Sequence, residues 1–587
     1  MHRFARFLPP SVLAVLLFLT FATPSSARAQ SRADDLHKFF QDAFEEELRD
    51  APEQATNVGR HEYDNRWTDW SKAGRDARRA HLEQRLRQLD TFSPEGLSDE
   101  DRLSIRLMRY DLQQRLTSNN VETHLLRLGQ VFGFHNTVYL VVDRMPARTV
   151  HDYENILARL HAIPAYVDQN IAILDEAIAQ NLTQPKVIVD LVLKQIASQL
   201  AQDTSNSGLL AAFRKFPANV PADEKARLLA DANTTYEKQF IPTWKKLQGY
   251  LNTTYMPHAR ATDGIGGLPQ GQEDYAILVR RFTTTNTTPA EIHAIGEREL
   301  ARIEAQMLDI AHGTGFNGTL KEFDAKLEAD PAQHFASKDE MLVYCRNIAK
   351  IIEPNLPNLF KHIPLLLYGV RPIPADREAS TPTNAQAPSP DGSTPGWFNL
   401  NTYEPAKQAR SNKESLVLHE AVPGHIFQIS LARALTGLPE FRRFYGNSAY
   451  VEGWALYVES VGKDLGMYTD PYSLYGQLAS ERFRAVRLVV DTGIHSQGWT
   501  REQAIAFFKE HAPDQSLAEV DRYISWPGQA LSYKMGQLKI RGLRTEAEKA
   551  LGPKFDVRDY HDVVLREGVL PLDLLEEQVK NYIAASK

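Results

Sequence analysis

The sequence predicts a mainly α-helical protein with a central cleft and a small β element next to its functional site. Long stretches place apolar residues three and four positions apart with charged residues between them, which is the pattern of amphipathic helices. Alternation of the kind that strands show is scarce. The chain has 587 residues, 43% hydrophobic and 24% charged, so it can bury a large core and is too long for one small unit.

The first 29 residues have the features of a signal peptide. Arg3 and Arg6 precede an apolar run over residues 13–22, and residues 27–29 read Ala-Arg-Ala, the small-x-small pattern before a cleavage site. The alternative is a retained membrane anchor, but the run is shorter than the roughly 20 residues that span a bilayer. We therefore expect cleavage after Ala29 and an exported protein, periplasmic or secreted, without stable membrane insertion.

After this segment the helical pattern recurs along the chain. We expect an N-terminal helical half over residues 30–290 and a C-terminal catalytic half over residues 291–587. The predicted helices cover residues 32–50, 74–90, 99–116, 150–180, 186–203, 222–250, 289–312 and 338–355.

A stretch rich in Pro, Ser, Thr and Ala, residues 374–395, leads into a segment with strand-like composition, residues 397–403. We interpret the first as a surface loop and the second as a strand beside the site. This strand could add an extended peptide to its edge, or it could be an ordinary packed strand.

Charge and cysteine content exclude some functions. The net charge is −7, becoming −10 if the signal segment is removed, and no Lys/Arg clusters stand out, so we expect no nucleic-acid partner. Cys345 is the single cysteine, so the chain cannot form an internal disulfide. Its stability must come from packing.

The most informative stretch is His419-Glu420-x-x-Pro423-Gly424-His425. A zinc-binding helix usually carries its two histidines four residues apart, whereas these are six apart and would point about 120° away from each other on an unbroken helix. Pro423 would clash with the carbonyl of His419. We therefore expect the helix to kink, bulge or be reset, which would turn His425 back toward His419. A capping box over residues 411–414 is expected to start this helix.

A third ligand is available downstream, where Glu452 and Glu459 share one face of a predicted helix. We favour Glu452 as the ligand, with Glu459 orienting a ligand histidine, although Glu459 could take its place. Two histidines and a carboxylate leave one position of tetrahedral Zn²⁺ open for water. Other divalent ions would tolerate the same ligands. Glu420 is then the natural general base.

Several motifs resemble the bacterial family called domain of unknown function (DUF) 885, and the likeness covers nearly the whole chain after the signal segment. The matching motifs are the HExxPGH stretch at 419–425, Glu452-Gly453-Trp454-Ala455, residues 491–495 (Asp-Thr-Gly-Ile-His) and residues 527–534. The resemblance implies a helical, zinc-dependent, metallopeptidase-like protein. Many members carry a second histidine after the one that matches His425, where this chain has Ile426.

Helical zinc peptidases similar to this family use Tyr and His to stabilise the oxyanion, which suggests His495 and Tyr533, with Lys534 and Tyr523 behind them. Each of these could instead have a packing role. Asp491 could orient His495 or cap a helix end.

The sequence thus predicts an exported zinc metallohydrolase that cleaves short peptides. Two alternatives remain: a zinc hydrolase of non-peptide amides or esters, and a catalytically silent helical binding protein. Exo- or endo-cleavage, side-chain specificity and oligomeric state are not specified by the sequence.

Overall fold

The computed structural model describes residues 24–365, 367–374, 378, 381–389, 394–513 and 515–587. Most of the predicted signal peptide, residues 1–23, lies outside them, and the first helix begins at Pro24 and continues through the expected cleavage point. The signal peptide therefore stays a prediction. Within the described residues, no helix combines the length and apolar character needed to cross a membrane.

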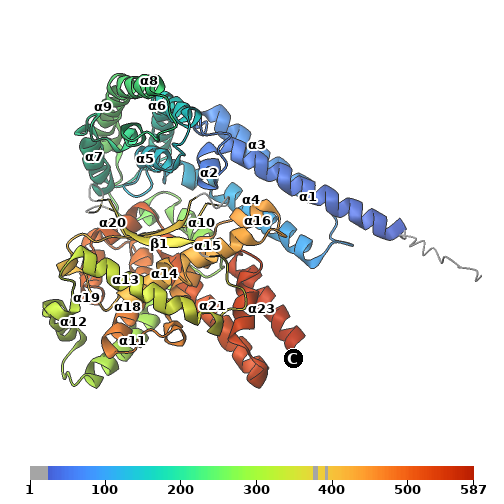
Figure 1. Ribbon diagram of the computed structural model, residues 1–587, viewed down its shortest axis with the longest axis vertical. Helices are drawn as coiled ribbons and strands as arrows, with labels where there is room; N and C mark the ends of the chain where they lie inside the picture. The colour runs from blue at the N-terminus through green and yellow to red at the C-terminus, as the bar shows by residue number, and fades with distance from the viewer. Residues whose placement is uncertain (1–23, 366, 375–377, 379–380, 390–393, 514) are drawn as a thin grey trace, which may run out of the picture.

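The protein is mainly helical, as the sequence predicts. Figure 1 shows an upper group of helices, a long N-terminal arm at its side, and a larger lower body. The arm contains α1 (Pro24–Asp50), α2 (Pro52–Asn57), α3 (Lys72–Leu89) and α4 (Asp99–His124). The upper group contains α5 (Phe134–Arg144), α6 (Val150–Ala179), α7 (Lys186–Leu200), α8 (Ala222–Thr235) and α9 (Ile241–Tyr250).

The lower body is formed by the rest of the chain. Its longer helices are α10 (Gly271–Thr283), α11 (Pro289–Gly313), α12 (Leu320–Ala329), α13 (Lys338–Ile352), α18 (Pro471–His495), α19 (Arg501–His511), α21 (Ser532–Leu551) and α23 (Leu572–Ser586). Shorter helices between them are α14 (Lys413–Glu420), α15 (His425–Ala434), α16 (Glu440–Phe444), α17 (Ser448–Glu459), α20 (Ala518–Ser525) and α22 (Val557–Leu565). Each of the eight predicted helices is confirmed, most within a few residues at either end.

A small mixed sheet accompanies these helices. Its strands are β1 (Tyr368–Pro372), β2 (Asn384–Gln386) and β3 (Gly396–Leu400), in the order β1-β3-β2, with β1 parallel and β2 antiparallel to β3. β2 and β3 contact α15, so the predicted strand does lie beside the helix that begins with His425. Because residues 397–399 of β3 are paired with β1 on one side and β2 on the other, this part of the strand has no free edge, which favours the packed strand of the two alternatives.

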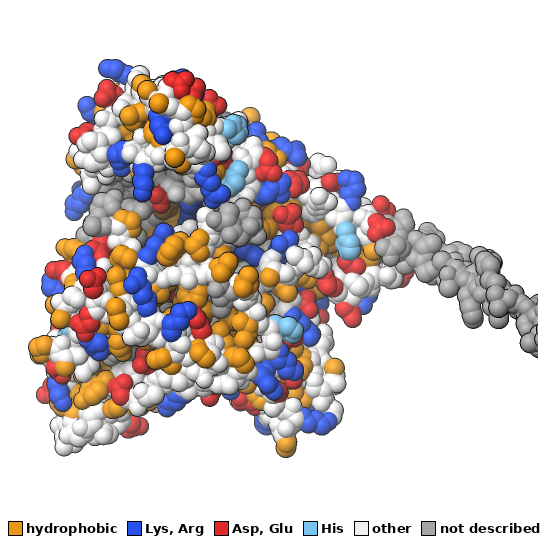
Figure 2. Space-filling model, viewed as in Figure 1, with side chains coloured by type: hydrophobic (Ala, Val, Ile, Leu, Met, Phe, Trp, Pro, Cys, Tyr) orange, Lys and Arg blue, Asp and Glu red, His pale blue; other side chains and the backbone are white. Residues whose placement is uncertain are grey.

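Apolar side chains gather in separate clusters. One of them, in the upper group, draws all its buried members from residues 67–255. The largest joins α4 of the arm to α13, α14, α17, α21, α22 and α23 of the lower body. The predicted boundary near residue 290 and the cleft between the halves stay predictions. On the face shown in Figure 2, basic and acidic side chains are interspersed.

Helices α17 and α21 approach each other through two glycines. A Cβ on Gly536 would lie 1.9 Å from the carbonyl oxygen of Ala449, and one on Gly453 would lie 2.5 Å from backbone atoms of Gly536. Only residues without a side chain fit at this distance. The contact sets the position of Glu452, which is next to Gly453, relative to Tyr533, which is one turn before Gly536.

We predict that Gly536→Ala lowers the free energy of unfolding by at least about 1–3 kcal/mol, since the added methyl meets backbone that must shift. Gly542→Ala is the matched control, because Gly542 lies on the same helix with nothing within 4 Å of an added Cβ. That variant should gain up to about 1 kcal/mol from helix propensity. Denaturant unfolding of both variants tests this, and equal stabilities would contradict the glycine contact.

Candidate metal centre

The two histidines lie on separate helices. Helix α14 ends at Glu420, Ala421 leaves the helical region with φ −102° and ψ −93°, and α15 starts at His425. A Cβ on Gly424 would lie 1.8 Å from the carbonyl oxygen of His419, so the new helix begins against the end of the old one. The indole Nε1 of Trp454 donates to the carbonyl of Pro423 at 2.9 Å and ties the break to α17. The predicted reset of the helix is confirmed.

The break brings His419, His425 and Glu452 together. One ligand atom from each lies within 4.8 Å of the others, the one such group of possible metal ligands among the described residues. Oε2 of Glu452 is 3.5 Å from Nε2 of His419 and 3.4 Å from Nε2 of His425. Two ligands about 2.0–2.1 Å from a tetrahedral zinc ion are roughly 3.3 Å apart, so these separations fit an ion of that size.

Glu459 fixes the orientation of one histidine. Its fully buried carboxylate lies 2.8 Å from Nδ1 of His419, so this nitrogen donates and Nε2 is free to face Glu452 and His425. Of the two roles that the sequence left open for Glu459, the structure shows the contact with Nδ1 of His419, on the side of the ring away from Glu452.

A buried carboxylate oxygen of Glu452 also has no hydrogen-bond partner within the described chain, and a bound cation would give it a ligand contact. Oε2 of Glu452 is buried and has no hydrogen-bond partner among the described residues, a costly arrangement unless a positive charge is supplied. Burial disfavours the charged forms of Glu452 and His419, but each of these two residues favours the charged form of the other. The pKa of Glu452 is held well below its usual range, and Glu452 and Glu459 raise that of His419 to about 9. A bound metal would displace this proton from His419.

Glu420 follows a candidate ligand histidine, and its carboxylate forms no hydrogen bond to any described residue. Burial raises the pKa of its carboxyl, while His419 and His425 act in the opposite direction. Arg484, from α18, also favours the ionised form of Glu420 and lies 3.7 Å from Glu459. The carboxylate is therefore free to accept a proton.

Tyr533 joins this group from α21. Its ring is nearly parallel to that of His419, at 14° with centroids 6.5 Å apart. Nη2 of Arg522 donates to the Tyr533 hydroxyl at 3.2 Å, and the guanidinium of Arg487 lies over the ring, 4.4 Å from its centroid. These arginines were not predicted as site residues, since nothing in their local sequence indicates contact with a residue of another helix.

His495 has a different environment. Its ring is fully buried, Nδ1 accepts from the backbone N–H of Ile265 at 3.1 Å, and Nε2 faces the carbonyl of Tyr523 at 3.0 Å. Burial lowers the pKa of His495 to about 3, so the ring is neutral. Both ring nitrogens are thus used within the protein, and the described contacts do not bring His495 to the His419 group.

The other residues considered from the sequence are also held within the protein. Asp491 accepts from the Tyr275 hydroxyl and the N–H of Gly528, so it binds a turn and does not orient His495. Lys534 is fully buried and donates to Glu481 at 2.6 Å.

The predicted capping box is wrong. Asn412 is the N-cap of α14 and forms no side-chain cap. The carboxylate of Glu414 accepts instead from the N–H of Tyr468 at 2.6 Å.

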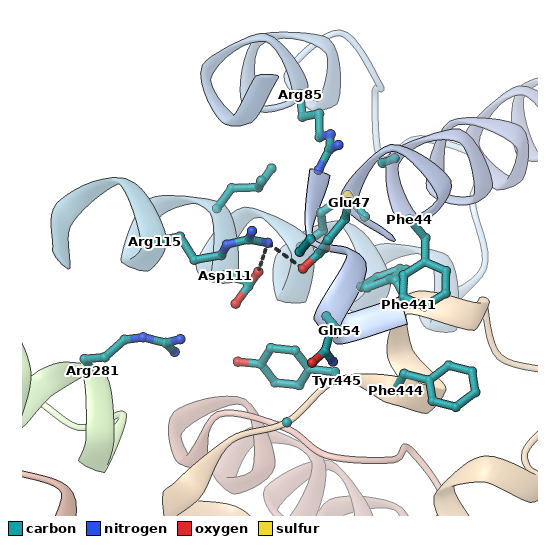
Figure 3. A pocket seen from close by; sticks show the side chains of 15 residues that line it. Phe44, Glu47, Gln54, Arg85, Asp111, Arg115, Arg281, Phe441, Phe444 and Tyr445 are labelled. Carbon is teal, nitrogen blue, oxygen red and sulfur yellow. Dashed lines mark hydrogen bonds and ion pairs between the residues drawn. The ribbon is translucent and has the colours of Figure 1, made fainter. Parts of the chain in front are cut away.

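A separate cavity of ≈ 390 Å³ lies among α1, α2, α4 and α16, and none of the candidate ligands lines it. Figure 3 shows its charged side chains facing one another, with Arg115 paired to Glu47 at 2.9 Å and to Asp111 at 3.5 Å. Both carboxylates are paired with Arg115, and Arg281 also acts on Asp111, so the cavity presents no comparable set of free ligands.

One family model matches most of the sequence, and two solved structures have a similar fold. The family described as "Bacterial protein of unknown function (DUF885)" matches residues 52–579. A crystal structure titled "putative lipoprotein from Colwellia psychrerythraea" has a TM-score of 0.89 and 27% identity, covering 94% of this chain and 99% of that one. A "putative lipoprotein of unknown function from Shewanella oneidensis" has a TM-score of 0.70 and 19% identity, covering 92% and 99%. No curated protein matches.

We predict that the chain retains a divalent metal through purification, with zinc the first candidate, and that His419→Ala loses it. Glu459→Gln should keep the site but weaken metal affinity about 10- to 100-fold, since carboxylates behind ligand histidines contribute that much. Elemental analysis and chelator competition measure both effects.

The exposed pair of His362 and Asp562, 2.5 Å apart, provides the control. His362→Ala should leave metal content unchanged. Full metal occupancy in His419→Ala would overturn the ligand assignment.

Proposed function

Because the chain belongs to the bacterial DUF885 family, whose description assigns no activity, we propose its function from the site itself: a zinc-dependent metallohydrolase that cleaves short peptides. The observation that supports this most is an unpaired carboxylate, Glu420, directly beside three convergent ligand groups. A purely structural metal site has no use for such a base.

His419, His425 and Glu452 would hold the ion, which supplies Lewis acidity toward the scissile carbonyl and lowers the pKa of water. Glu420 accepts a proton from the water molecule whose oxygen attacks the carbonyl carbon. It then delivers this proton to the nitrogen as the C–N bond breaks, which balances the hydrolysis.

Tyr533 is our candidate for stabilising the oxygen that becomes negative as water adds. Its hydroxyl already accepts an N–H from Arg522, which polarises the O–H and makes it a better donor. His495, also expected in this role from the sequence, is left out of the proposed mechanism, because its nitrogens are engaged elsewhere.

We also propose export, based on the sequence of residues 1–29 and on the descriptions of the two similar structures as lipoproteins. An exported peptidase would act on short peptides outside the cytoplasm.

We predict that Glu420→Gln retains the metal and lowers kcat by about 10²–10⁴-fold, because the amide cannot accept the proton. Peptide hydrolysis by the purified protein, followed by mass spectrometry, measures this. Glu414→Gln is the control on the same helix: an amide oxygen can still accept from the Tyr468 N–H, so turnover should stay near that of the unmodified protein. Unchanged turnover in Glu420→Gln would rule out its role as the base.

A further inference from the structure

Beyond Tyr533 lies a group of three charged residues whose charges do not cancel. Arg487 of α18 donates through Nη2 to Glu519 at 2.8 Å, and Nη1 of Arg522 of α20 lies 3.4 Å from the same carboxylate. Two guanidinium groups therefore share one carboxylate. Arginine stays protonated even when buried, so the group keeps a surplus positive charge.

Both arginines also have N–H groups that are not hydrogen-bonded within the described part of the chain. Nη1 of Arg487 and Nε of Arg522 are buried without a hydrogen-bond partner in the described part of the chain. The Arg487 side chain is 5% exposed, and that of Arg522 is 19% exposed. Leaving buried N–H groups of charged residues unpaired is costly. An anionic ligand would satisfy them and neutralise the surplus charge.

Tyr533 connects this group to the candidate metal centre. Its hydroxyl contacts Arg522, and its ring centroid is 4.4 Å from the guanidinium carbon of Arg487 and 6.5 Å from the ring centroid of His419. The positive group is thus separated from the candidate centre by one tyrosine ring. Up to two residues of an extended peptide, about 3.3–3.6 Å each, together with hydrogen bonds of about 2.7–2.9 Å to the arginines, span a distance of this order.

We propose that Arg487 and Arg522 bind a carboxylate of the substrate, in the first place the free C-terminal carboxylate, so that the protein removes one or two residues from the C-terminus of short peptides. This inference rests on the proposed peptidase function. The C-terminal carboxylate belongs to the amine product of the cleavage, so its capture places the scissile bond at a fixed distance from the chain end. Guanidinium groups suit this ligand because they can form paired, charge-assisted hydrogen bonds to a carboxylate.

Binding to the metal-free protein tests the subsite independently of turnover. After treatment with a chelator, N-acetyl-trialanine with a free C-terminus should bind about 10- to 100-fold more tightly than its C-terminal amide in calorimetric titration. Arg522→Gln should remove this difference, and Arg522→Lys should restore part of it through its charge. Equal binding of acid and amide by the unmodified protein would overturn the proposal.

Arg501→Gln is the matched control. Arg501 pairs with Asp521, the neighbour of Arg522 on α20, through an Nε–Oδ1 contact of 2.5 Å, so the variant removes an equivalent charge without touching Tyr533. It should keep the preference for the acid. Loss of the preference in Arg501→Gln as well would mean that net charge alone is responsible, against a built site. Thermal unfolding of each variant verifies that it is folded.

Hydrolysis by the metal-loaded protein then distinguishes binding of a C-terminal carboxylate from binding of a side-chain carboxylate. If the acid is cleaved at its C-terminal end and the amide is not, the terminal carboxylate is the ligand. If an amidated peptide ending in glutamate is cleaved as well as the acid, and Arg522→Gln loses both, the subsite accepts a side-chain carboxylate too. If all peptides are cleaved at equal rates, this inference fails while the proposed function stands; if none is cleaved, the proposed function fails.

Discussion

The interruption between α14 and α15 is the constraint on which the candidate centre depends. On one continuous helix, His419 and His425 would point in directions too different to share an ion. Ending the first helix at Glu420 and starting the next against its last carbonyls turns the second imidazole back. It also leaves Glu420 at a helix end, where its side chain is not committed to the packing of a further turn. Residues 421–424, which separate the two helices, therefore set both the ligand geometry and the freedom of the proposed base.

Charged residues lie both next to the candidate centre and farther from it. Glu459 behind His419 is fully buried, Glu452 faces the two imidazoles, and Arg484 lies close to Glu459. Farther out, Arg487 and Arg522 share Glu519. Negative groups thus lie next to the candidate metal ligands, and the surplus positive charge of Arg487 and Arg522 lies on the other side of their contacts with Tyr533, where the proposed substrate carboxylate would bind. Such an order of charges suits a substrate that is polar along its whole length.

Helix periodicity and the HExxPGH motif were sufficient to predict the fold class, eight helical segments and the meeting of His419, His425 and Glu452, although the long helices α18 and α21 were not among the predicted segments. These features depend on local sequence and on one backbone distortion. The contacts of Arg487, Arg522 and Arg484 could not be predicted, because long side chains reach partners that only tertiary packing brings near. The capping box failed for the same reason: Tyr468, 54 residues downstream, supplies a competing N–H for Glu414. His495 was ambiguous, since a buried histidine held by two backbone groups has the same sequence signature as a functional one.

The glycine contact between α17 and α21 has a consequence for how this protein can adapt. Proteins commonly gain thermal tolerance by replacing helical glycines with alanine and by filling internal space. Alanine cannot replace Gly453 or Gly536 in this way, because the backbones of α17 and α21 are already in contact there. A shift of α17 would also move Glu452, the carboxylate of the candidate centre. Variants of this chain suited to warmer surroundings should therefore keep both glycines and change at the periphery, such as the solvent-facing turns of α21 around Gly542.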